Sequence, residues 1–381
     1  MAIAMLWAGV VATLLFRAVT QYRHYEILRR MEPRRLPSPA LVTVIVPARN
    51  EARNIARCAQ RLMAQDYPKL EMLVVNDNST DHTATIVSDL SCFDARLRLV
   101  ESEALPSGWA GKPHACWQGA QAGAGEWLCF MDADTMAEPG LITTAVRAAE
   151  ERQLDMLSLE PFQELGGFWE RLIIPAGFLL LVFQQDLRRV NNPDCPDAVA
   201  NGQFILIRRR VYDAVGGHAA APAEICEDAA LARRVKGEGY KLAVLGASDL
   251  VCSRMYNNLE SLWEGLSKNV VEMLGGTRGA LLAAAAAFSL AWVTALLPFW
   301  AWHQGDALAA SLISTASLAL IATHVFSARY FGIPFFYGLL FPFGYTMGGL
   351  IALNSIRLRW KKRIAWKGRI YAPPAAITTA P

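Results

Sequence analysis

The chain has 381 residues, of which 53% are hydrophobic, and a formal net charge of +3 at neutral pH. A net charge this small argues against nucleic-acid binding, because that function requires a strongly positive surface. The seven cysteines are odd in number and show no C-x-x-C or His/Cys metal spacing, which favours reduced thiols over a disulfide framework.

The first 22 residues are predicted to form a transmembrane anchor. The apolar run from Met1 to Thr20 has no basic segment before it and no small-residue cleavage site, so a retained anchor is favoured over a cleaved signal peptide. Residues 23–40 follow as a basic, proline-rich linker. The arginines of this linker predict that it lies on the cytoplasmic side of the membrane.

Residues 41–275 are predicted to form an α/β domain. Strand-like runs alternate with helix-like segments, at 41–46, 70–75, 97–101 and 127–131. This alternation is typical of a mostly parallel sheet covered by helices. Polar motifs around Glu51, Asp77 and Asp132 each follow a strand directly. Because parallel strands share one carboxyl edge, where open α/β sheets bind ligands, we expect these motifs to gather there.

Asp132 and Asp134 stand one residue apart, just after the apolar run at 127–131. Two carboxylates at a sheet edge suit a hard divalent cation, which often carries a substrate phosphate. A D-x-D pair alone is expected about once by chance in a chain of this length. Its place among the other strand-end motifs is what favours a metal site.

The segment 167–186 is apolar, but Glu170, Arg171 and Pro175 interrupt it. Its uninterrupted part is too short to span a bilayer, so either an interfacial helix or a buried core helix is predicted. A further strand is predicted at 201–207. Helices are predicted at 229–238, opened by the adjacent pair 227–228, and at 259–273.

The region 279–356 is predicted to contain two or three membrane segments, and 357–381 form a basic tail. Spans are expected at 281–302 and 307–326, whereas the third apolar region, at 331–356, contains prolines that allow a re-entrant path. Three crossings would place the tail outside, but its basic residues favour the cytoplasm. The sequence leaves both topologies open.

Four motifs stand at 46–51, 76–81, 132–134 and 227–228. Their order and spacing resemble those of family 2 inverting glycosyltransferases of the GT-A fold. Other segments look like the bacterial branch that contains carotenoid-acid and hopanoid-associated membrane enzymes, at 108–112, 201–204, 216–218 and 366–371. Ceramide glucosyltransferases are more distant relatives. The resemblance covers about 41–273 and implies a Rossmann-like nucleotide-sugar-binding domain.

On the donor side, the resemblance implies that Pro47, Glu51 and Asp77 face the nucleoside of a nucleotide-diphosphate sugar, with Asp77 accepting hydrogen bonds from the base. It also implies donor contacts from Asp132 and Lys112. Mg²⁺ or Mn²⁺ would be held on the diphosphate by the carboxylates of 132 and 134. Lys112 would add a point charge to the phosphates, although a solvated loop lysine is the ordinary alternative.

On the acceptor side, the resemblance implies that Asp228 is the general base, which takes a proton from the acceptor hydroxyl as it attacks the anomeric carbon. One displacement of this kind inverts that carbon. Other acceptor-side candidates are Asn201, Gly202, Gln203, Glu227 and Trp263. Helix packing is the ordinary explanation of Trp263.

Two departures from the family pattern matter. Asn76 stands where many members have an aspartate, so only Asp77 is assigned to the base. The Q-x-x-R-W motif of processive synthases is missing at the expected distance after Asp228, which favours transfer of a single sugar. The cluster at 366–371 is either an interfacial anchor for anionic lipid or a part of the active site.

These observations predict a multi-pass enzyme of the inner (plasma) membrane with a cytoplasmic catalytic domain. It would move one sugar, most simply from a UDP-hexose, to a membrane lipid, with no role for nucleic acid. Two alternatives stay open: a processive polysaccharide synthase of the same fold, and a catalytically degenerate nucleotide-sugar-binding module.

Overall fold

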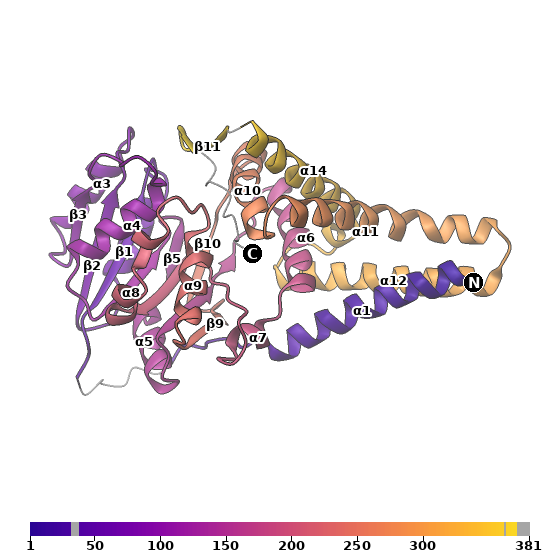
Figure 1. Ribbon diagram of the computed structural model, residues 1–381, viewed down its shortest axis with the longest axis horizontal. Coiled ribbons are helices and arrows are strands. Elements are labelled where there is room, and N and C mark those ends of the chain that lie inside the picture. The colour runs from indigo at the N-terminus through magenta and orange to yellow at the C-terminus, as the bar shows by residue number, and fades with distance from the viewer. Residues whose placement is uncertain (32–37, 362, 372–381) are drawn as a thin grey trace, which may run out of the picture. The chain divides into compact units, whose positions relative to one another are not determined.

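The computed structural model describes residues 1–31, 38–361 and 363–371 (Figure 1). Parts of the predicted linker and basic tail, at 32–37, 362 and 372–381, therefore lie outside the described residues. The chain divides into two compact units. The α/β unit comprises Tyr25–Gln163, Leu187–Met255 and the segment that begins at Lys367. The helical unit comprises Met1–His24, Glu164–Asp186 and Tyr256–Trp366.

A seven-stranded sheet forms the centre of the α/β unit, in the order β3-β2-β1-β4-β8-β6-β9. The strands are β1 (Val42–Ala48), β2 (Leu70–Asn76), β3 (Leu97–Glu101), β4 (Trp127–Met131), β6 (Met156–Glu160), β8 (Phe204–Arg208) and β9 (Leu242–Gly246). Only β8 runs antiparallel to its neighbours in this sheet. The mostly parallel sheet predicted from the sequence is confirmed.

Helices cover both faces of this sheet (Figure 1). They are α2 (Ile55–Met63), α3 (Thr83–Ser91), α4 (Gly111–Ala122), α5 (Leu141–Glu151), α7 (Leu187–Asn191), α8 (Arg209–Ala214) and α9 (Glu227–Gly237), with a 3-10 turn at Gly217–Ala220. Adjacent strand residues face opposite sides of a sheet. Thus Val44 packs in a core with Ile55 and Leu141, whereas Ile45 packs in a second core with Ala115 and Leu231.

The α/β unit also contains a small three-stranded sheet, in which the strands neighbour one another in the order β5-β10-β7. Its strands are β5 (Thr135–Ala137), β7 (Phe162–Gln163) and β10 (Val251–Ser253). It matters for the site because β5 begins directly after Asp134, and β10 ends at Ser253. The predicted strand at 201–207 is shorter than expected, since β8 begins only at Phe204.

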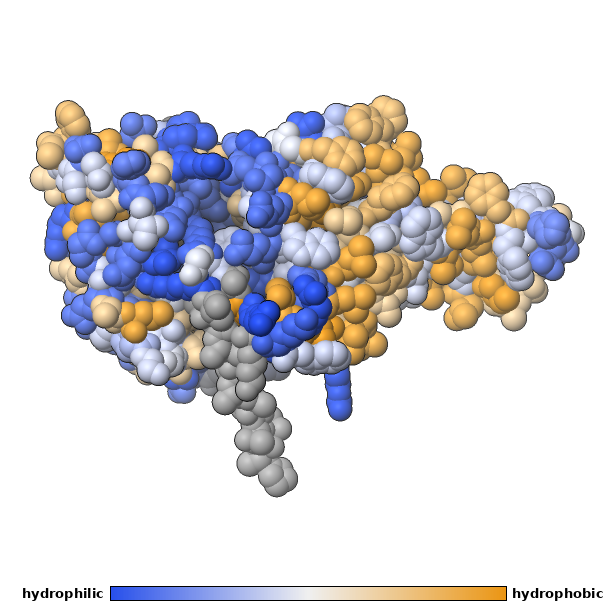
Figure 2. Space-filling model, turned by 90° about the horizontal axis from the view of Figure 1, so that it is seen from above, coloured by the Kyte–Doolittle hydropathy of each residue, from blue (hydrophilic) through white to orange (hydrophobic). Residues whose placement is uncertain are grey.

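The helical unit contains α1 (Ala2–His24), α6 (Phe168–Gln184), α10 (Leu259–Met273), α11 (Thr277–His303), α12 (Ala307–Tyr330), α13 (Phe336–Leu339) and α14 (Phe341–Trp360). It also contains the short strand β11 (Ile364–Trp366), whereas β12 (Arg369–Tyr371) belongs to the α/β unit. Within the described residues, three helices are long and apolar enough to cross a membrane: α1, α11 and α12. Large hydrophobic side chains of these helices are exposed, among them Leu6, Phe299 and Leu318, and Figure 2 shows hydrophobic surface gathered at one end of the molecule.

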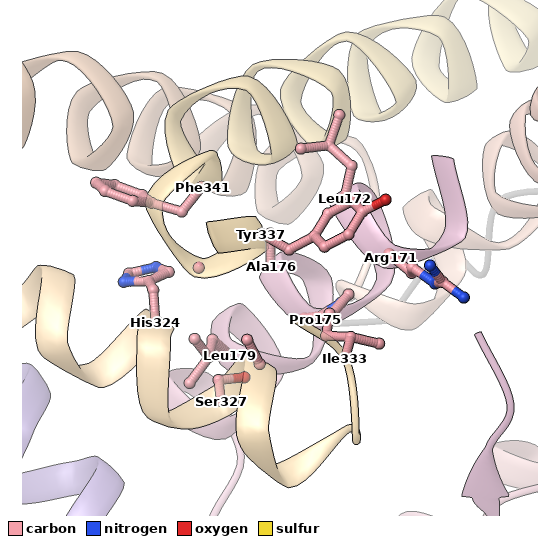
Figure 3. Close-up of a pocket in the computed structure, with 12 residues that line it drawn as sticks. Arg171, Leu172, Pro175, Ala176, Leu179, His324, Ser327, Ile333, Tyr337 and Phe341 are labelled. Carbon is pink, nitrogen blue, oxygen red and sulfur yellow. The ribbon is translucent and has the colours of Figure 1, made fainter. Parts of the chain in front are cut away.

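The segment predicted as an interfacial or core helix is α6, and it buries Leu172, Ile173 and Ala176. With residues of α12 to α14 it lines the small pocket of Figure 3, into which His324 and Tyr337 project. The His324 ring lies 3.0 Å from the Tyr345 hydroxyl and 2.8 Å from the Leu320 carbonyl oxygen. None of the predicted site residues lines this pocket.

Candidate functional site

The polar motifs at Glu51, Asp77 and Asp132 follow the carboxyl ends of β1, β2 and β4. These three strands are neighbours, and β1 pairs in parallel with both of the others. Because parallel strands place their carboxyl ends at one edge, the three motifs share that edge. Pro47 is the next-to-last residue of β1, partly exposed and opposite Val75 of β2.

Side chains of the loop after β1 form hydrogen bonds with the backbone of the loop after β2. The Arg49 guanidinium donates to the carbonyl oxygens of Asp77 at 2.7 Å and Asn78 at 2.8 Å. Asn50 adopts a left-handed backbone conformation, with φ of 53°, that asparagine tolerates better than most residues. Its side-chain oxygen accepts a hydrogen bond of 2.8 Å from the Thr80 amide. The edge where a nucleoside is expected is therefore held by cross-loop hydrogen bonds.

Asp77 is buried at this edge. Its amide donates to the Ala48 carbonyl oxygen at 2.8 Å, which continues the strand pairing by one residue. One carboxylate oxygen, Oδ2, accepts a hydrogen bond from Arg369. The other, Oδ1, is buried and accepts no hydrogen bond from the described residues. A buried acceptor without a partner is costly, and it marks a place where a ligand N–H can bind.

Glu51 uses both of its carboxylate oxygens. Oε2 accepts a hydrogen bond of 2.8 Å from Asn54, and Oε1 pairs with Lys367. The Glu51 amide donates to Thr83 at 2.9 Å, at the start of α3. Three separate contacts therefore hold Glu51 in position, and its predicted role facing the nucleoside stays a prediction.

Lys112 connects the donor and acceptor candidates. It lies in the first turn of α4, and its Nζ is 2.6 Å from Oδ1 of Asp132 and 2.7 Å from Oε1 of Glu227. Burial lowers the pKa of Lys112, but the carboxylates of Asp132 and Glu227 outweigh this effect and hold the pKa well above its usual value. The ammonium therefore stays charged across the physiological range.

Asp132 and Asp134 were predicted to hold a metal ion. Burial, followed by the negative charges of Asp132 and Glu51, raises the pKa of Asp134 above its usual value. Binding a cation relieves such repulsion between carboxylates, so the pair fits a hard divalent ion. No group of three or more His, Cys, Asp or Glu side chains is arranged for a metal within the described residues. The protein would therefore supply two ligands at most from this motif.

Asp228 lies in the first turn of α9 with both carboxylate oxygens engaged. Oδ2 accepts a hydrogen bond of 2.8 Å from the Gly202 amide, and Oδ1 accepts one of 2.7 Å from the Ala229 amide. Burial and the neighbouring Glu227 raise the pKa of Asp228 to about 6, against the lowering effect of Lys112 and the two amides. A carboxylate with a pKa near this value is suited to accept a proton during a reaction.

Gly202 permits the close approach of Lys112 and Asp228. A Cβ at this position would lie 3.1 Å from Nζ of Lys112 and 3.1 Å from Oδ2 of Asp228. Both distances are shorter than ordinary contacts, so a side chain here would displace one of the two groups. The candidate base and the cation beside Asp132 therefore meet over one glycine.

Gln203 is buried and takes part in a hydrogen-bond network. Its Nε2 donates to Ser253 at 2.8 Å, and its Oε1 accepts from Gln163 at 2.9 Å. Ser253 in turn donates to Oδ1 of Asp134 at 3.3 Å. Asn201 closes the turn before β8 by accepting a hydrogen bond of 3.0 Å from the Gln203 amide. The acceptor-side role predicted for both residues stays a prediction, and the structure adds a link to Asp134.

Trp263 lies partly exposed on α10 in the helical unit, and its acceptor-side role also stays a prediction. Sequence reasoning did not assign a role to Arg49 or Ser253, although Arg49 stands inside the motif at 46–51. It left Lys367 and Arg369 between a lipid anchor and an active-site role. The structure pairs these two cations with Glu51 and Asp77.

Known proteins similar to this chain in sequence or fold are glycosyltransferases. Residues 43–216 match the family model described as Glycosyl transferase family 2. The chain is 28% identical over 246 residues to a 4,4'-diaponeurosporenoate glycosyltransferase of Staphylococcus aureus strain MRSA252, and 27% identical to the protein of that name from strain USA300. The match covers 64% of this chain and 64% of each relative, so the chain spans less than two thirds of their length.

The fold is similar to that of the mannosyltransferase PcManGT from Pyrobaculum calidifontis, whose structure contains GDP-Man and Mn²⁺. The TM-score is 0.56 at 18% sequence identity, and the likeness covers 95% of this chain and 99% of that one. At this level of identity the two proteins share a fold.

Proposed function

We propose that the chain transfers one sugar from a nucleotide-diphosphate sugar to a lipid acceptor, because residues 43–216 match the family model described as Glycosyl transferase family 2 and the fold is similar to that of a mannosyltransferase. The observation that carries the proposal is the pair of contacts from Lys112 to Asp132 and Glu227. They bring the donor-side carboxylates next to Asp228. A donor at the sheet edge and an acceptor beside Asp228 would therefore be adjacent.

The donor would lie along the carboxyl ends of β1, β2 and β4. Asp77 would accept an N–H of the base through its unpaired Oδ1, and Glu51 would face the nucleoside. Asp132 and Asp134 would hold Mg²⁺ or Mn²⁺, which supplies positive charge to the departing diphosphate. Lys112 would contribute a further positive charge at the same place. The Mn²⁺ in the similar mannosyltransferase supports the choice of a divalent ion.

Asp228 would remove the proton from the acceptor hydroxyl as that oxygen attacks the anomeric carbon. Its position is fixed by the amides of Gly202 and Ala229, so the carboxylate needs no rearrangement to act as a base. A single displacement inverts the anomeric carbon and requires only one base. The diphosphate leaves without a general acid, since its charge is already stabilised by the groups around it.

A lipid acceptor is supported by two observations. The S. aureus relatives are named for a carotenoid acid, 4,4'-diaponeurosporenoate. In addition, α1, α11 and α12 are long and apolar enough to cross a membrane. An acceptor dissolved in the same membrane would reach the enzyme by lateral diffusion.

The number of membrane crossings bears on which side of the membrane holds the α/β unit. Both Tyr25–Gln163 and the segment from Lys367 belong to the α/β unit, so they lie on one side. Among the described residues between Met255 and Lys367, two helices are long and apolar enough to cross a membrane, α11 and α12. Two crossings return the chain to its starting side, and α14 then does not span. The basic residues flanking these helices favour the cytoplasm for that side.

Mass spectrometry of membrane lipids from cells making the wild-type chain, Asp228→Asn or Asp213→Asn tests the proposal. Asp213 is an exposed aspartate of α8 and serves as the matched control. A hexose-sized mass increase on one lipid class is expected with wild type and Asp213→Asn, and not with Asp228→Asn. Three identical lipid profiles would contradict the proposal, and a ladder of added sugars would favour a processive synthase.

A further inference from the structure

The segment after the helical unit brings two cations to the donor edge. Lys367 pairs with Oε1 of Glu51, and Arg369 pairs with Oδ2 of Asp77. The side chains of Lys367 and Arg369 are only 25% and 17% exposed. Ion pairs this sheltered differ from the exposed pairs that contribute little to proteins. Removing one partner would leave a carboxylate uncompensated at the sheet edge.

The backbone turns sharply at Lys367 and Gly368, between the two cations. Lys367 and Gly368 both have positive φ, at 45° and 77°, which is the conformation of a tight turn. The Lys367 carbonyl oxygen accepts a hydrogen bond of 3.2 Å from Nε of Arg49. Arg49 also donates to the loop that carries Asp77. The segment is therefore tied to the β1 and β2 loops by backbone as well as by side chains.

Arg369 engages one of the two oxygens of the Asp77 carboxylate. It occupies Oδ2, while Oδ1 stays buried without a hydrogen bond from the described residues. A carboxylate held at one oxygen by a guanidinium is fixed in orientation, and its second oxygen is available to accept an N–H. The imide N–H of a uracil or guanine base is a donor of this kind.

The charges of the site point in the same direction. Six carboxylates gather around the strand ends and the start of α9: Glu51, Asp77, Asp132, Asp134, Glu227 and Asp228. Lys112 is already shared by two of them. A diphosphate carries negative charge, so it would be repelled by an edge without further cations. Lys367 and Arg369 reduce that repulsion where the nucleoside is expected.

We propose that Lys367 and Arg369 are donor-site residues, with Arg369 positioning Asp77 for the base and Lys367 neutralising Glu51, so that nucleoside diphosphate binding requires this segment. The inference rests on the proposed function, since it assigns a nucleoside diphosphate to the same edge. It goes further by making part of the donor site from residues that follow the membrane helices in the sequence. An interfacial anchor for anionic lipid does not require these two ion pairs.

Isothermal titration of UDP and GDP, with Mn²⁺, into the full chain in detergent tests this. Arg369→Ala and Lys367→Ala are each expected to weaken binding of the preferred nucleotide about tenfold or more, because each leaves a carboxylate unpaired beside the ligand. Arg369→Lys should recover part of the loss. Lys361→Ala, which changes an exposed cation nearby in sequence, should bind like wild type.

A double-mutant cycle separates positioning from general support of the fold. If Arg369 acts through Asp77, the double variant Asp77→Asn/Arg369→Ala should bind no more weakly than Asp77→Asn alone. Additive losses, or a lower unfolding temperature that accounts for the loss, would overturn the positioning role. Unchanged or tighter nucleotide binding by Arg369→Ala and Lys367→Ala would overturn the inference while leaving the proposed function intact. Wild-type chain that binds neither nucleotide would overturn the proposed function itself.

Discussion

The Nζ atom of Lys112 lies 2.6 Å from Oδ1 of Asp132, so the cation expected on the donor phosphates contacts a carboxylate expected to hold the metal. The same ammonium reaches Glu227, the neighbour of Asp228 in the first turn of α9. Two ends of the candidate site, far apart in the sequence, thus depend on one side chain. Replacing Lys112 would therefore affect both ends of the site at once.

Lys112→Met is expected to lower donor turnover by about a hundredfold or more, because it removes a charge that favours the transition state and unpairs two carboxylates. The Michaelis constant for the donor should rise as well. Steady-state release of nucleoside diphosphate measures both effects. Lys69→Met alters an exposed lysine of the same unit and is the control. Turnover within about threefold of wild type would remove Lys112 from the mechanism.

The pH dependence of turnover reports on Asp228. Its pKa is raised to about 6, and a general base must be deprotonated to act. As the pH falls through 6, the carboxylate takes up a proton and the rate should fall about tenfold per unit below it. A profile of turnover at saturating donor and acceptor checks this. An acidic limb near the ordinary aspartate pKa would contradict the raised pKa of Asp228.

Gly202→Ala should lower turnover while leaving the fold intact, because the new methyl group would press on both Lys112 and Asp228. Displacing a reacting group by a few tenths of an ångström is enough to slow a reaction, here by about tenfold. Gly237→Ala is the matched control, since a Cβ there meets nothing within 4 Å. Equal activities of the two variants would show that the close approach has no catalytic importance.

Removal of divalent metal should abolish turnover, and Mn²⁺ or Mg²⁺ should restore it. Because the D-x-D motif supplies two carboxylates at most, the diphosphate is expected to complete the coordination. Mn²⁺ should therefore bind much more tightly with UDP than without it, which electron paramagnetic resonance of free Mn²⁺ measures. Full turnover after exhaustive chelation would contradict a metal-assisted reaction.

Arg209 offers a test of stability away from the site. Its guanidinium donates to the carbonyl oxygens of Ala120, Gly123 and Gly125, at 2.9, 2.8 and 2.6 Å, around the end of α4. Arg209→Met should lower the free energy of unfolding by about 2 kcal/mol, the typical loss for hydrogen bonds to a charged group. Denaturant unfolding of the chain in detergent measures this.

Arg210→Met is the control for that experiment. The Arg210 guanidinium pairs with the carboxylate of Asp155, and the Arg210 side chain is 75% exposed. Such a pair contributes little, so the free energy of unfolding should change by less than about 1 kcal/mol. If Arg210→Met lowered the free energy of unfolding as much as Arg209→Met, the three hydrogen bonds of Arg209 would not explain the loss.

Local patterns made much of the α/β unit predictable. The apolar runs before Glu51, Asp77 and Asp132 became β1, β2 and β4, since β-branched and apolar residues favour buried strands. The predicted helix at 259–273 coincides with α10. Near β8 the prediction began too early, because the turn that Asn201 closes occupies the residues expected to open the strand.

Long-range contacts could not be predicted in this way. Lys367 and Glu51 are separated by 316 positions, and no local pattern specifies that they pair. The link from Gln203 through Ser253 to Asp134 likewise depends on three strands of two sheets. In the membrane region, α12 ends at Tyr330 and Gly332 follows it with a left-handed φ of 65°, yet composition alone did not distinguish a re-entrant segment from a span.

The pairing of Lys367 and Arg369 with residues of the first two strand loops also sets an order of events during synthesis. The ribosome makes α11 and α12 before it reaches these two cations. Until then, Glu51 and Asp77 lack the partners they have in the finished chain. The donor edge would acquire its final charge balance only after both helices have been translated. A shortened protein that stops at Met255 would keep the strand-end motifs but present a more negative edge to its nucleotide.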